Sequence, residues 1–261
     1  MTLSRTPLQP ERLRNLRWSF PKDFSFARDR LSVPLIHTEI LRVAREYPIA
    51  MAPDGEGRWM AVAYLGDIAG TANRFVDASG SWTAAYVPFW LRVYPFVRDE
   101  AGAFAVTLDP TFVGVGGTYA FDDGDALSKE ASEVALQLER AETGRGQVAD
   151  AATALVTGGV ASHRLDGVGP EDLAFVPAGR PAEVIGPRTV DWFGRGARMV
   201  EMAVAAAFSS AFMPRAVPSA LTLDPQRPAT AGRLPPAAPL YVPTAAVADL
   251  DWLDMDEKVL F

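Results

Sequence analysis

The sequence predicts an α+β fold, with a mostly antiparallel sheet in the first half, helices in the second half and an extended proline-rich C-terminal tail. Three observations lead to this class. Short apolar runs separated by turn residues dominate the chain up to about residue 125, the apolar spacing becomes helical from Ala126, and eight prolines fall between Pro214 and Pro243. Strands followed by helices, rather than alternating with them, favour α+β over a parallel βαβ architecture.

Composition narrows the class of protein. The 261 residues are 49% hydrophobic and 22% charged, as in globular domains. A net charge of −7 argues against sequence-independent nucleic-acid binding, which needs a basic surface, and the absence of cysteine excludes disulfides and thiolate nucleophiles. The basic N-terminus lacks the apolar run of a secretory signal, and no apolar run is long enough to span a bilayer. We therefore expect a cytoplasmic protein with no membrane span.

The first part of the chain divides into an arm and the start of a domain. Residues 1–30 mix basic and aromatic positions without a regular period and predict an N-terminal arm, and residues 31–213 are expected to form one α+β domain. Helical spacing predicts a helix over 36–47 that Pro48 ends. Two apolar runs on either side of Asp54–Gly57 predict a β-hairpin within 48–66.

The densest stretch of unusual residues is 74–96, RFVDASGSWTAAYVPFWLRVYPF. It predicts a short strand at 74–76, a tight turn at Asp77–Gly80 and a short helix in which Pro88 takes the first position. A strand, a turn at 99–102 and a second strand follow, and the glycines at 114–117 predict another turn between strands.

Helices dominate the second half. One is predicted from Ala126, with Asp125 as its N-cap, and helical character resumes at 149–156 after the break at Gly144–Gly146. A mostly apolar helix is expected over 189–212. Residues 214–261 are predicted to form a separate proline-rich and then acidic amphipathic segment, and its partner is another protein, a second copy in a homo-oligomer, or the chain's own domain.

Enzymatic motifs are few. His37, Glu39 and His163 match the H-x-E…H ligand set of iron(II) oxygenases. Helical spacing would place His37 and Glu39 about 200° apart around the axis, which disfavours a metal site, so no metal and no cofactor is expected. No G-x-S-x-G motif surrounds a serine, and the glycines at 114–117 lack the G-K-[ST] ending of a phosphate loop.

Arg92 is the most conspicuous polar residue of the 74–96 stretch. An arginine framed by Trp90 and Tyr94 can stack on aromatic rings and still donate two hydrogen bonds to a carboxylate. That carboxylate belongs either to Asp77, in an internal tie, or to a ligand. The candidate binding residues are Arg92, Asp77, Trp82, Tyr86, Trp90 and Tyr94.

Residues 73–96, NRFVDASGSWTAAYVPFWLRVYPF, resemble the bacterial SapC family. Members share a pattern close to N-x-F-V-D-x-x-G-x-W-x-x-x-Y-x-P-x-x-L-R-x-Y-P-F, and a histidine often lies where His37 stands. The likeness covers about residues 30 to 213 and is strong to about 125, so the 31–213 domain is expected to be SapC-like. Members typically carry an A-H-L-x-S-L-like sequence where this chain has Ala206–Ser210, so no role that needs that histidine is expected here.

The resemblance attaches no firm reaction to the chain. The expected function is that of a non-catalytic accessory or binding protein of this family, which engages a protein or peptide partner through the aromatic and arginine surface. The alternative is an iron and 2-oxoglutarate enzyme, or another peptide-modifying enzyme, that uses His37, Glu39 and His163.

Overall fold

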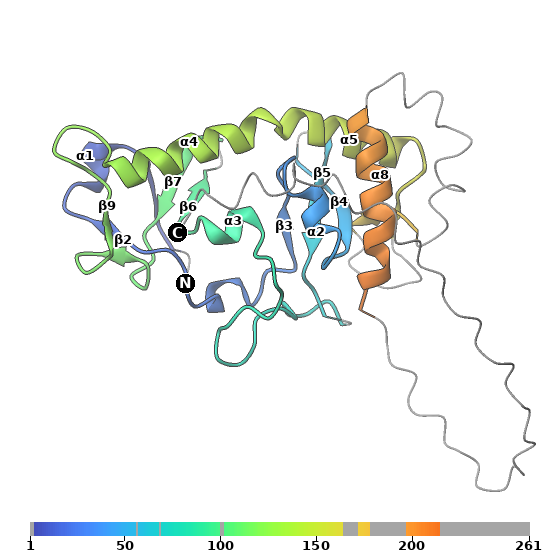
Figure 1. Cartoon of the computed structure of the whole chain (residues 1–261), viewed down its shortest axis with the longest axis horizontal. Helices are drawn as coiled ribbons and strands as arrows, with labels where there is room; N and C mark the ends of the chain where they lie inside the picture. The colour runs from blue at the N-terminus through green and yellow to red at the C-terminus, as the bar shows by residue number, and fades with distance from the viewer. Residues whose placement is uncertain are drawn as a thin grey trace, which may run out of the picture. The chain divides into compact units, whose positions relative to one another are not determined.

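The computed structural model describes residues 3–55, 57–67, 69–99, 102–163, 172–177 and 197–214 (Figure 1). The described elements belong to one unit, residues 1–217. The acidic segment predicted near the C-terminus, nearly all of the proline-rich segment and the first residues of the helix predicted over 189–212 lie outside the described residues. Antiparallel strands precede the main helices, which confirms the α+β class. Within the described ranges, no helix is long and apolar enough to cross a membrane.

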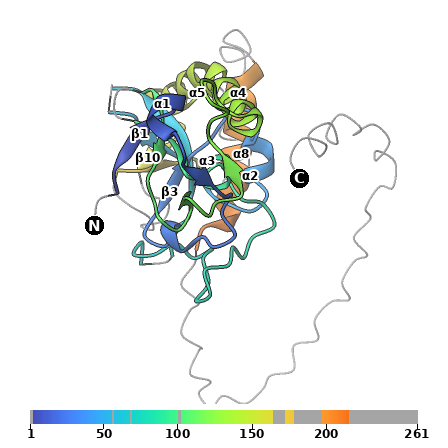
Figure 2. The ribbon, with the colours of Figure 1, turned by 90° about the vertical axis from the view of Figure 1, so that its left-hand side faces the viewer.

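The larger sheet has five antiparallel strands. Their order is β10 (Ser162–His163), β11 (Ala174–Phe175), β4 (Ile49–Pro53), β5 (Trp59–Tyr64) and β3 (Ser32–Pro34). The predicted hairpin is confirmed as β4 and β5, joined by a turn in which Gly55 adopts a φ of 81°. Helices α2 (Ile40–Val43), α5 (Arg145–Thr157) and α8 (Ala197–Ser209) pack on this sheet, and α2 lies beside α8 (Figure 2).

Two smaller sheets surround a second core. One has the order β1 (Arg5–Pro7), β7 (Phe104–Thr107) and β6 (Phe96–Arg98), and the other β8 (Val113–Gly114), β2 (Arg17–Trp18) and β9 (Tyr119–Ala120). Residues 1–30, expected as an arm, thus supply one strand to each of the two smaller sheets. The same segment contains α1 (Pro10–Leu13) and a short 3₁₀ turn, η1 (Ser25–Ala27). Trp18 is fully buried, with the ring centroids of Phe20 and Phe96 4.6 and 4.8 Å from its own.

Helix α4 (Lys129–Thr143) and α5 together run past both cores (Figure 1). Leu138 of α4 packs into the second core, whereas Leu155 of α5 packs into the first. Gly144 separates the two helices at a tight point, because a Cβ atom there would lie 1.9 Å from Nδ1 of His37. Both helices therefore hold the two cores in a fixed relation within this unit.

Several helix boundaries differ from the sequence predictions, and α5 begins at Arg145 rather than near 149. The helix expected over 36–47 is confined to α2. Its start is delayed because the side chain of Glu39 accepts a hydrogen bond from the Ile36 N–H and closes a turn before it. Ser128, not Asp125, caps α4, since its Oγ accepts a hydrogen bond from the Ala131 N–H at 3.1 Å. The short helix α3 (Phe89–Arg92) forms as expected, although Pro88 is its N-cap rather than its first residue.

Candidate functional site

The aromatic residues predicted as a binding surface make many internal contacts. Tyr94 is only 3% exposed, and its hydroxyl donates to Oδ2 of Asp109 at 3.0 Å. Trp82 is half-buried, and its Nε1 donates to the Tyr86 carbonyl at 3.1 Å and to the Tyr47 hydroxyl at 3.0 Å. Such bonds hold the 74–96 stretch in place, so these rings act first as part of the fold.

The structure places Arg92 and Asp77 in separate environments. Oδ1 of Asp77 accepts hydrogen bonds from the Ser79 hydroxyl at 2.6 Å and from the N–H groups of Ser79 and Ser81 at 2.8 and 2.9 Å, and these bonds lower the pKa of Asp77. The Arg92 guanidinium lies 5.3 Å from the ring centroid of Tyr86 and donates to its hydroxyl at 3.4 Å. Asp77 thus stabilises its own turn, and Arg92 lies exposed on Tyr86.

Glu39 is a buried structural carboxylate. It is 2% exposed, its Oε1 accepts from the Ile36 N–H at 2.9 Å, and its Oε2 accepts from the Phe89 N–H and the Tyr86 hydroxyl, both at 2.9 Å. Burial raises the pKa of Glu39, against the opposing effect of these bonds. Both oxygens are therefore engaged in joining α3 to the turn before α2.

The two histidines of the predicted ligand set belong to different elements. His37 faces the α4–α5 junction, where its imidazole approaches Gly144. The backbone of His163 pairs with Ala174 in the larger sheet. Among the described residues, no group of three or more histidine, cysteine, aspartate or glutamate side chains is placed to hold a metal ion.

A cleft of about 750 Å³, which the sequence did not indicate, opens between the two cores. Its walls come from β1, β3, β4, β5, β6, α3 and the α4–α5 junction. Two of the predicted aromatic residues, Trp90 and Tyr94, line it. Five arginines and three carboxylates also line it, in a chain whose net charge is −7. These charged residues are Arg5, Arg30, Arg58, Arg98, Arg145, Asp54, Asp99 and Glu142.

A family model described as SapC matches residues 8–162, more than half of the chain. This chain belongs to the SapC family. Comparison with curated proteins and with solved structures found no match. Most of the cleft wall of this SapC protein falls within the matched segment, whereas Arg5 precedes it.

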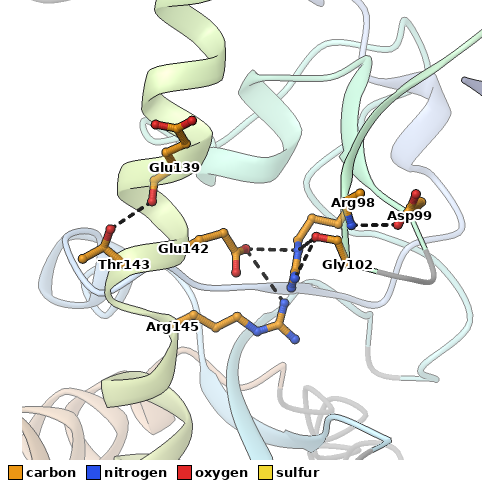
Figure 3. A network of polar contacts seen from close by, with 8 residues as sticks. Arg98, Asp99, Gly102, Glu139, Glu142, Thr143 and Arg145 are labelled. Carbon is orange, nitrogen blue, oxygen red and sulfur yellow. Dashed lines mark hydrogen bonds and ion pairs between the residues drawn. The ribbon is translucent and has the colours of Figure 1, made fainter. Parts of the chain in front are cut away.

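Three arginines of the SapC cleft are held by acidic side chains of the same wall. Figure 3 shows the Glu142 carboxylate beside Arg98 and Arg145, with Oε1 of Glu142 3.3 Å from Nε of Arg98 and 3.9 Å from the nearest Arg145 nitrogen. Arg98 also donates two hydrogen bonds to the Gly102 carbonyl, and Arg58 pairs with Asp54 at 3.2 Å. Burial raises the pKa of Glu142, and Arg98 opposes that rise. In this part of the wall, carboxylates therefore neutralise most of the positive charge of the arginines.

The other two arginines of the cleft, Arg5 and Arg30, differ from these three because no described acidic side chain of the wall pairs with them. Neither guanidinium forms a hydrogen bond or an ion pair with any residue that the structure describes. Arg30 is exposed as a whole residue, yet enough protein surrounds its guanidinium that burial lowers its pKa, and the charge of Arg5 lowers it further, while Tyr94 acts in the opposite direction. The cleft thus carries a local excess of positive charge at these two positions.

The cleft also follows the edge of β3 that pairs with no other strand among the described residues. In β3, the Leu31 carbonyl accepts from the Leu65 N–H and the Leu35 N–H donates to Ala61, so Leu31, Val33 and Leu35 pair with β5. The backbone groups of Ser32 and Pro34 point away from β5. Positions 32–36 all line the cleft, and β3 is the last strand of the described sheet. An N–H and two carbonyls that bond to no described residue thus lie along the cleft.

Proposed function

We propose that this SapC-family chain is a non-catalytic accessory protein that binds an extended segment of a protein or peptide partner in the cleft. One observation carries the proposal: the edge of β3 that pairs with no described strand runs along a cleft of about 750 Å³. An unpaired edge accepts an added strand through main-chain hydrogen bonds. Because Pro34 has no N–H, the added segment would bond to the N–H and carbonyl of Ser32 and to the carbonyl of Pro34.

The size and lining of the cleft agree with a short peptide segment. Its volume is in the range of about 300–1,000 Å³ typical of ligand sites, and three residues of an extended strand span about 10 Å. Trp90 and arginine side chains line it, and tryptophan and arginine are the residue types that dominate binding energies at interfaces. Glu142 and Asp54 are engaged by arginines, which favours binding over acid–base chemistry at this site.

Site-specific photocross-linking tests the location of the partner. A photoreactive residue at Ser32 is compared in host cells with the same residue at Val115, which is 83% exposed in a loop outside the cleft. We expect a defined partner segment to be linked from Ser32 and not from Val115. Identical products from both positions, or none from Ser32, would contradict the proposal.

Reconstitution tests the binding mode. The linked segment is synthesised as a peptide and titrated against the purified chain, while amide hydrogen exchange is measured with and without it. Addition of a strand to β3 should slow exchange at the Ser32 N–H, whereas the Val33 and Leu35 N–H groups, which already face β5, should change less. A peptide that binds without protecting Ser32 would exclude strand addition.

A further inference from the structure

The arginines of the cleft fall into two classes, and this division points to the chemistry of the occupant. Arg58, Arg98 and Arg145 are each paired with a carboxylate of the wall. Arg5 and Arg30 have no such partner among the described residues, although they lie close enough for the charge of one to affect the other. The positive charge of the cleft is therefore concentrated where no acidic side chain meets it.

Backbone hydrogen bonds fix the points from which these two exposed side chains extend. Arg5 lies in β1, where it pairs with Thr107 of β7, and the Arg30 N–H donates to the Ala27 carbonyl at 3.1 Å. Tyr94, which contributes to the electrostatics of Arg30, is itself fixed by its bond to Asp109. Both side chains line the same cleft, and an anion bound between them would offset their like charges.

We propose that Arg5 and Arg30 form an anion subsite that selects partner segments carrying a carboxylate side chain, glutamate or aspartate. This inference rests on the proposed function, because the segment is the one that lies along β3 in the same cleft. A guanidinium donates two parallel hydrogen bonds to a carboxylate, and Arg is the residue suited to that geometry. A glutamate or aspartate of the bound segment would therefore provide the carboxylate acceptor that Arg5 and Arg30 do not find among the described residues.

Phosphate offers similar oxygen atoms, but the rest of the wall favours a carboxylate. Asp54, Asp99 and Glu142 also line the cleft, and a phosphate group carries more negative charge than a carboxylate toward those three side chains. A single carboxylate offsets half of the excess of two positive charges and is repelled less by those three side chains. The test therefore includes a phosphorylated peptide, whose affinity is compared with that of the glutamate peptide.

Defined peptides provide the first measurement. The probes are acetyl-Thr-Val-Xaa-Val-Thr-amide with glutamate, glutamine or phosphoserine at Xaa, titrated against the full chain by calorimetry. We expect the glutamate peptide to bind at least tenfold more tightly than the glutamine peptide, and Arg30→Ala to remove that preference. Arg140→Ala is the matched control, because Arg140 is exposed on α4 outside the cleft and its loss changes the net charge equally. Arg30→Ala should unfold at the wild-type temperature or above, since it relieves repulsion, and Arg140→Ala should unfold at nearly the wild-type temperature because Arg140 is exposed.

The outcomes separate the two proposals. If the glutamate and glutamine peptides bind equally and both protect Ser32, the anion subsite is wrong and the proposed function stands. Preference for the phosphoserine peptide over the glutamate peptide would overturn the choice of a carboxylate. If no peptide binds, a titration with N-acetylglutamate amide, followed by the ¹⁵Nε resonances of arginine, decides: shifts confined to Arg5 and Arg30 support the subsite without the proposed function, and unchanged resonances refute it.

Discussion

Replacing Glu39 by glutamine should destabilise the fold by about 2 kcal/mol, because one buried donor loses its acceptor. The glutamine side chain has nearly the same size, and its single oxygen can take the place of Oε2, which serves the Phe89 N–H and the Tyr86 hydroxyl. Its NH₂ group then faces the Ile36 N–H, so two hydrogen-bond donors meet and neither has an acceptor. A buried N–H without an acceptor costs about 1–3 kcal/mol, and Glu39→Ala, which deprives all three donors, should cost about 4 kcal/mol or more.

The cost of Glu39→Gln should also depend on pH in a defined direction. Burial raises the pKa of Glu39, so the folded state holds this proton more tightly than the unfolded state does. The stability that the proton provides is fully present below the ordinary glutamate pKa, about 4.3, and is lost as pH rises through the raised value. Glutamine does not titrate, so the difference between wild type and variant should be largest in acid and should narrow as pH rises.

Urea unfolding followed by tryptophan fluorescence, from pH 4 to pH 8, measures this difference. Glu139→Gln is the control, because Glu139 is exposed on α4, and its effect should stay within about 0.5 kcal/mol at every pH. A Glu39→Gln difference that is constant, or that grows with pH, would show that the native pKa of Glu39 is not raised. A difference below about 0.5 kcal/mol throughout would refute the structural role of its three hydrogen bonds.

Three local substitutions test the helical layer. Gly144→Ala should destabilise the fold by about 1–3 kcal/mol, because its Cβ would lie 1.9 Å from Nδ1 of His37, whereas Gly146→Ala, with nothing within 4 Å, should stabilise it by about 0.5–1 kcal/mol. Equal shifts in melting temperature would contradict the tight junction. Ser128→Ala should cost about 1 kcal/mol through loss of the α4 N-cap, and an unchanged urea midpoint would exclude that role.

The elements that the sequence predicted well are those determined by neighbouring residues. The β4–β5 hairpin follows from turn residues between two apolar runs, and the turn at Asp77 follows from a side chain that bonds to Ser79 and Ser81. The helix predicted over 36–47 begins only at Ile40, because the contacts of Glu39 shape the turn before it. Glu39 bonds both to Ile36, which closes a turn, and to Phe89, fifty positions away, and helical periodicity carries no information about that contact.

The aromatic stretch shows the same division between local and distant determinants. The sequence located its turn and its short helix, but the partners of its side chains lie outside it. Tyr94 bonds to Asp109, and Trp82 bonds to Tyr47 as well as to Tyr86 within the stretch. The dense cluster of aromatic residues in the sequence therefore indicated internal packing at least as much as a binding surface. Of the predicted binding residues, only Trp90 and Tyr94 line the cleft.

No sequence pattern could have identified the arginine excess in the cleft, because its members are distributed from position 5 to position 145 of a chain with net negative charge. Which arginines remain available is decided by the carboxylates, since Glu142 engages two of them and Asp54 a third. Of the remaining two, Arg30 lies inside the segment that matches the SapC model and Arg5 precedes it. Comparing Arg5→Ala with Arg30→Ala therefore separates a subsite that needs only the matched segment from one that needs both arginines of this chain.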